Sequence, residues 1–107
     1  MALTLQSALI LQAIENGYVF GFDIMRITEL PSGTVYPALR RLERQGLISS
    51  RWEDGDEAHA DARPARKYFK LEPRGTRQLA DCRQQEKFIG RALSAVPLKA
   101  ATEGATP

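Results

Sequence analysis

The sequence predicts a mainly α-helical fold with one small β-hairpin, and three observations support this prediction. Three segments within the first 45 residues combine helix-forming residues with Gly or Pro at their ends. Two short segments that favour extended structure follow them. The last segment, from about residue 74 or 76 to residue 95, again carries apolar side chains at helical spacing. The order helix, helix, helix, hairpin, long helix is that of a winged helix-turn-helix with a C-terminal extension.

The composition excludes several broad classes of protein. The chain has 107 residues, of which 43% are hydrophobic and 26% charged, the balance of one soluble globular domain with little room for a deep substrate cleft. One cysteine excludes an internal disulfide framework and a Cys-based zinc site, and it fits a reducing compartment. The longest apolar runs are too short for a membrane span or a signal-peptide core. We therefore expect a cytoplasmic protein with no membrane association.

The first predicted helix covers residues 4 to 16, which contain no Gly or Pro. Thr4 can cap its start, and Asn16 with Gly17 provides its C-terminal stop. More than half of its circumference is apolar, through Leu5, Ala8, Leu9, Leu11, Ala13 and Ile14. Such a helix must be buried on more than one side, in a core, in a dimer contact or in both.

A helix-turn-helix pair is predicted next. Residues 21 to 28 form a helix of about two turns, which Pro31 prevents from continuing. Ser32 is expected to cap a third helix over residues 33 to 45, which Gly46 terminates.

The third helix is predicted to have one apolar and one basic face. Its apolar stripe consists of Val35, Ala38, Leu39 and Leu42. Arg40 and Arg44 lie opposite this stripe, and Arg41 and Pro37 lie beside them. One face therefore packs on a core and the other presents positive charge.

A two-stranded hairpin, the wing, is predicted from residues 47–52 and 67–71. The polar stretch between them, residues 53–66, is longer than a tight turn. Trp52 is expected to be a core residue at the base of the wing.

The last segment carries the argument for a dimer. Apolar positions recur at heptad spacing over Leu79, Cys82, Glu86, Ile89, Leu93 and Val96, interrupted by the one glutamate. Packing on a second copy is the favoured interpretation, and folding back onto the chain's own core is the alternative. The predicted dimer interface consists of Leu5, Leu9, Leu79, Cys82, Ile89 and Leu93. The chain would then divide into a winged helix-turn-helix domain (1–72), a C-terminal dimerisation helix (73–96) and a disordered tail (97–107), with Cys82 as a small buried hydrophobe.

The residue types that catalysis requires do not occur in a usable arrangement. The only histidine, His59, lies in an acidic stretch with no nucleophile paired to it, and no glycine-rich phosphate loop occurs. The stretch from Glu53 to Asp61 carries five carboxylates, but their spacing matches no calcium or zinc pattern. We interpret it as a solvated loop and expect no enzymatic activity, no metal and no cofactor.

The distribution of charge is more informative than the net charge of +2. Five arginines and two glutamates lie between Arg26 and Arg51, and six basic residues and one glutamate lie between Arg63 and Arg77. Both basic blocks fall on the parts of a winged helix that meet DNA, the third helix and the hairpin, where Arg and Lys bind phosphates. An ordinary solvated helix face is the alternative for the arginines of the third helix.

Two motifs resemble the PadR-type transcriptional regulators. Residues 31–48, with Ser32-Gly33-Thr34-Val35-Tyr36-Pro37-Ala38-Leu39 at their start, resemble the recognition helix of that family, and Tyr-Pro inside this helix is rare in other winged helices. Residues 63–71 resemble the return strand of its wing. The resemblance covers roughly residues 4 to 95.

The resemblance implies a homodimer that binds double-stranded DNA at an inverted repeat and represses transcription. The implied DNA contacts are Ser32, Thr34, Tyr36 and Arg40 in the third helix and Arg63, Arg66 and Lys67 in the wing, to which the basic helix face adds Arg41 and Arg44. For Tyr36, packing against the neighbouring helix is the alternative. A small-molecule effector of unknown chemistry is a possible further partner.

Two features depart from the family pattern. The link between the second and third helices, residues 27–31, is shorter than usual, and the wing loop is longer and more acidic than expected. A protein-interaction module that has the same fold but does not bind DNA is the alternative function.

Overall fold

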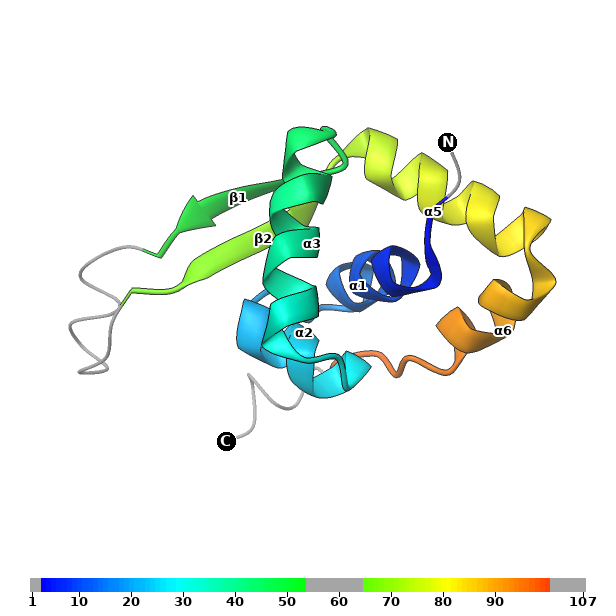
Figure 1. Ribbon diagram of the computed structural model, residues 1–107, viewed down its shortest axis with the longest axis horizontal. Coiled ribbons are helices and arrows are strands. Elements are labelled where there is room, and N and C mark those ends of the chain that lie inside the picture. The colour runs from blue at the N-terminus through cyan, green and yellow to red at the C-terminus, as the bar shows by residue number, and fades with distance from the viewer. Residues whose placement is uncertain (1–2, 54–64, 101–107) are drawn as a thin grey trace.

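The computed structural model describes residues 3–53 and 65–100 of the chain (Figure 1). Its helices are α1 (Leu5–Glu15), α2 (Gly21–Thr28), α3 (Ser32–Arg44), α5 (Pro73–Gln85) and α6 (Lys87–Ser94), and its strands are β1 (Ile48–Trp52) and β2 (Lys67–Leu71). The two strands pair antiparallel, from Ile48 opposite Leu71 to Trp52 opposite Lys67. The predicted winged helix-turn-helix is confirmed.

The ends of the first and third helices follow the predicted capping chemistry, with one exception. The Thr4 hydroxyl accepts a hydrogen bond from the Ser7 amide at 3.1 Å. Gly17 and Gly46 have φ of 108° and 77°, the left-handed conformation that favours glycine after a helix. Ser32 is not the cap of α3, because Pro31 occupies that position and its carbonyl accepts the Thr34 and Val35 amides.

The core surrounds α1, which lies in the middle of the molecule (Figure 1). This helix contacts α2, α3, β2, α5 and α6. Seven of its residues are buried: Ser7, Ala8, Ile10, Leu11, Gln12, Ala13 and Ile14. Most of the broad apolar surface that predicted burial on more than one side is therefore covered by the chain's own elements, whereas Leu5 stays exposed and Leu9 half-buried.

The turn between α2 and α3 consists of three residues, 29–31. Glu29 has φ 57° and ψ 28°, so a residue with a side chain occupies the left-handed region. The link between α2 and α3 is thus short, as the sequence predicted, and it contains one residue in an unfavourable backbone conformation.

Replacing Glu29 with glycine should raise the free energy of unfolding by about 1 kcal/mol, because glycine adopts a positive φ without the Cβ penalty. Urea denaturation of the wild type and of Glu29→Gly measures the difference. Glu72→Gly, at a residue with φ −91°, is the control and should not stabilise the chain.

The prediction of one continuous C-terminal helix is wrong. Glu86, with φ −119° and ψ 92°, separates α5 from α6. The break lets both helices pack on α1. Gly90 allows α6 to approach the end of α5 closely, because a Cβ there would lie 2.9 Å from the Arg83 carbonyl oxygen. The predicted heptad seam requires one straight helix, whereas this segment consists of two helices.

Three residues of the predicted dimer seam lie in the core of the chain itself. Leu79 and Leu93 are 0% and 1% exposed, and Cys82 is also buried. Burial raises the pKa of the Cys82 thiol, and the nearby Glu86 carboxylate adds to the effect. For these three side chains the structure shows the alternative that the sequence left open, packing on their own core.

The segment after α6 packs on the helices instead of forming a free tail from residue 97. The Lys99 amide donates to the Asn16 carbonyl at 2.9 Å, and the Asn16 side chain donates to the Val96 carbonyl at 3.0 Å. The Lys99 ammonium lies 3.6 Å from a carboxylate oxygen of Asp23. The predicted disorder of residues 101–107 concerns positions outside the described residues.

Within residues 3–53 and 65–100, no helix has the length and apolar character needed to cross a membrane.

Candidate nucleic-acid interface

The outer face of α3 presents two arginines to solvent. Arg40 and Arg44 are exposed, whereas Val35, Leu39 and Leu42 on the opposite side are buried at 1% exposure or less. Among residues 3–53 and 65–100, no carboxylate forms a salt bridge with either arginine. The division into an apolar and a basic face predicted for this helix is confirmed.

The other predicted contacts on α3 differ in how freely they face solvent. Ser32 is exposed and Thr34 is half-buried. Arg41 is exposed, but its guanidinium donates to the Ser7 hydroxyl of α1 at 3.1 Å, which holds it against the helical body.

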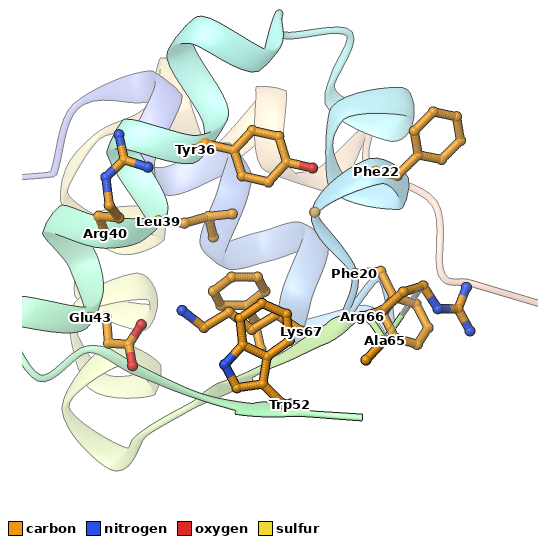
Figure 2. A pocket seen from close by; sticks show the side chains of 12 residues that line it. Phe20, Phe22, Tyr36, Leu39, Arg40, Glu43, Trp52, Ala65, Arg66 and Lys67 are labelled. Carbon is orange, nitrogen blue, oxygen red and sulfur yellow. The ribbon is translucent and has the colours of Figure 1, made fainter. Parts of the chain in front are cut away.

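Tyr36 packs against the neighbouring helix, which is the alternative that the sequence left open for it, and yet stays partly exposed. Its side chain packs against the backbone of Gly21 at the start of α2, where a Cβ would lie 2.6 Å from the Tyr36 ring. The residue is nevertheless 40% exposed, and its hydroxyl points toward the start of α2 (Figure 2). A glycine at position 21 therefore sets where this ring lies.

The hairpin is fixed to the helical body by a stack of rings and guanidinium groups. The Arg66 guanidinium lies 3.8 Å from the centre of the Phe20 ring, and the Phe20 and Tyr68 rings are 4.6 Å apart. Arg51 covers the Tyr68 ring at 4.1 Å. A backbone bond from the Phe69 amide to the Val19 carbonyl, 2.8 Å long, adds a second attachment. The predicted DNA contact Arg66 thus also has a structural role.

Glu53 differs from the solvated acidic loop in which the sequence placed it, because it is only 5% exposed. Its carboxylate accepts hydrogen bonds from the Arg66 amide at 3.3 Å and the Tyr68 hydroxyl at 3.4 Å, and it lies 3.5 Å from the Arg66 guanidinium. The remaining acidic residues of the loop, together with His59 and Arg63, lie outside the described residues.

Glu53→Gln should lower the free energy of unfolding by about 1–2 kcal/mol, because hydrogen bonds to a buried charged acceptor are worth about that much. Thermal and urea denaturation measure this loss. Glu86→Gln, at an exposed carboxylate, is the matched control and should leave stability unchanged; equal effects in both variants would contradict the structural role of Glu53.

A groove of about 420 Å³ separates α3 from the hairpin (Figure 2). Tyr36, Arg40 and Glu43 line it from α3, and Trp52, Lys67 and Phe69 line it from the hairpin. Glu43 is held by a 2.7 Å hydrogen bond that the Ser50 hydroxyl donates. The groove brings together four of the predicted contacts, since Arg66 also lies along it with Tyr36, Arg40 and Lys67.

The expectation that Trp52 is a core residue is wrong, because the side chain is 65% exposed. Ile48, Ser50 and Trp52 share one hairpin face, which is buried at its first residue and exposed at its last. The hairpin projects beyond the helices (Figure 1), so the end of this face has no helix to pack on. The alternation of side chains along a strand could have predicted that Trp52 shares a face with Ile48. Its exposure could not be predicted, because it depends on how far the hairpin projects beyond the helices.

Comparison with known proteins identifies one family. The family model described as the transcriptional regulator PadR-like family matches residues 10–81. A PadR family transcription regulator from Clostridium difficile is 26% identical with a TM-score of 0.69, over 85% of this chain and 96% of that one. A PadR-like transcription factor from Bacteroides fragilis is 25% identical with a TM-score of 0.64, over 82% and 85%. No curated protein sequence matches the chain.

A third solved structure shares the fold. It is a PadR-like transcriptional regulator from Bacillus cereus, 22% identical with a TM-score of 0.62, over 82% of this chain and 86% of that one.

Proposed function

The chain belongs to the PadR-like family of transcriptional regulators, and from this premise we propose that it binds double-stranded DNA as a homodimer and represses transcription. The observation that carries the proposal is the exposed pair Arg40 and Arg44 on the outer face of α3, next to the basic hairpin. The third helix enters the major groove in helix-turn-helix proteins, and basic side chains on the hairpin then bind the flanking phosphates.

We assign the DNA contacts to Ser32, Thr34, Tyr36, Arg40, Arg41, Arg44, Arg63, Arg66 and Lys67. Arg40 and Arg44 are the residues expected to bind DNA most strongly, because nothing in the described part of the chain holds their charge. Arg41 and Arg66 have partners within the chain, so their contribution is expected to be smaller.

The homodimer is proposed to form through α1 and α6. Leu79, Cys82 and Leu93 are occupied by the core. The apolar side chains of these two helices that remain accessible include Leu5 at 36% exposure and Phe88 at 73%, with Leu9 and Ile89 half-buried beside the core. Burying such side chains against a second copy is favourable because it removes apolar surface from water.

Selection of duplexes from a random-sequence DNA library tests the proposed function. A dimer that places its two α3 helices in successive major grooves requires half-sites about 10 base pairs apart, in an inverted repeat. We expect the enriched duplexes to carry this repeat and to be retarded by the protein in a mobility-shift assay. The absence of any enriched duplex would favour the alternative, an interaction module that does not bind DNA.

The remaining parts of the proposal follow from the family. A transcriptional regulator of this kind acts in the cytoplasm and needs no catalytic site, and an effector that changes its affinity for DNA would be a small molecule.

A further inference from the structure

The groove between α3 and the hairpin is lined on the hairpin side by an exposed tryptophan that the proposed DNA contacts do not use. Trp52 is 65% exposed at the end of β1 and lines this groove. Its partner across the strand pair is Lys67, whose ammonium lies 5.5 Å from the centre of the indole. Exposed tryptophan is unusual on a surface that stays in water and is enriched where proteins bind partners.

We infer that one sugar–phosphate strand of the bound DNA runs through this groove, where Trp52 packs on a deoxyribose and its indole N–H donates to a phosphate oxygen. Tyr36 and Arg40 form the α3 side of the groove, and Trp52 and Lys67 form the hairpin side (Figure 2). The inference rests on the proposed function and names the part of the DNA that occupies the groove.

The chemistry of the groove matches a sugar–phosphate strand. Arg40 and Lys67 supply positive charge, and Arg66 adds a guanidinium that is shared with Glu53, against the single carboxylate of Glu43 among the described lining residues. That carboxylate is half-buried and already accepts the Ser50 hydroxyl, so part of its hydrogen-bonding capacity is used within the chain. A DNA strand alternates an apolar sugar with an anionic phosphate, and the neighbouring indole and ammonium of Trp52 and Lys67 present the complementary pair.

The position of the hairpin that carries Trp52 is set before DNA binds. The stack of Arg66, Phe20, Tyr68 and Arg51 and the bond from Phe69 to Val19 attach the hairpin to α2 and to the chain preceding it. A preorganised contact loses little conformational entropy on binding, which favours affinity.

Trp52 is the only tryptophan of the chain, so the intrinsic fluorescence of the wild-type protein reports on this groove directly. The probe is the duplex selected from the random library. We expect its addition to shift the emission and to reduce acrylamide quenching by about twofold, in step with the mobility shift, since an interface core excludes water. N-acetyltryptophanamide with the same DNA controls for optical artefacts.

The two ways in which this experiment can fail are distinguishable. If the duplex is retarded by the protein but the emission and the quenching do not change, the DNA strand does not bind in this groove. The proposal that the protein binds DNA would then still hold. If no duplex is retarded, the inference fails together with the proposed function.

Variants give an independent measurement of the same contact. Trp52→Ala should lower the affinity for the selected duplex about tenfold, as the loss of a buried aromatic anchor does, and Trp52→Phe should lower it about threefold because a ring remains. Leu98→Ala, at an apolar residue that is 76% exposed after α6, is the matched control and should leave the affinity unchanged. Equal affinities of the wild type and both Trp52 variants, at equal thermal stability, would overturn the inference.

Discussion

Replacing Arg40 and Arg44 together with alanine should weaken binding to the selected duplex by about 100-fold or more. A good arginine contact to a base edge is worth about 1–3 kcal/mol, and a dimer would lose four arginines at once. The free energy of unfolding should change by no more than about 0.5 kcal/mol for each replacement, because both side chains are exposed and lie opposite the buried stripe of α3. Fluorescence anisotropy with the labelled duplex measures the affinity, and urea denaturation measures the stability.

The matched control removes the same charge from another face. Arg77 on α5 and Arg91 on α6 are also exposed, and alanine at both positions should change the affinity by less than about threefold, because charges distant from the DNA are screened by salt. Equal losses in the two double variants would mean that net charge, and not the face of α3, determines binding.

Leu93→Ala should lower the free energy of unfolding by about 3 kcal/mol. Leu93 is 1% exposed in the core that α6 forms with the rest of the chain. Removing a buried leucine side chain loses its transfer free energy and leaves a cavity, and costs of about 2–5 kcal/mol are usual. Urea denaturation at a fixed protein concentration gives the value.

The variant Phe88→Ala distinguishes the contribution of α6 to the core from its contribution to the proposed dimer contact. Phe88 is on the same helix but 73% exposed, so its loss should leave the stability of the folded chain nearly unchanged while it weakens the proposed dimer. Sedimentation or light scattering over a range of concentrations measures the dimer. A large loss of stability in Phe88→Ala with none in Leu93→Ala would contradict the arrangement of α6 described here.

Local sequence signals predicted most of the fold because the determinants lie within a few residues. Thr4, Gly17, Gly46 and Pro31 act on their own neighbours, and the 3- and 4-residue spacing on α3 depends only on helix geometry. The arginine pair of the candidate site could be found for the same reason, since a residue opposite a buried stripe is exposed wherever the helix packs.

The features that could not be predicted depend on contacts distant in the sequence. The break at Glu86 has no Gly or Pro to mark it, and it is stabilised by packing of both α5 and α6 on α1. Glu53 is buried because Tyr68 of the opposite strand and Arg66, just before that strand, form hydrogen bonds with it. Trp52 has an apolar side chain typical of a core, yet it is 65% exposed at the end of β1.

The salt dependence of the affinity for the selected duplex tests the central claim, that two copies place α3 and the hairpin together on DNA. A dimer that neutralises about six to ten phosphates should give a slope of about −5 to −9 for the logarithm of the association constant against the logarithm of the salt concentration. The bound species should contain two chains on one duplex and protect a symmetric footprint. A single chain on an asymmetric site, with a slope shallower than about −3, would contradict it.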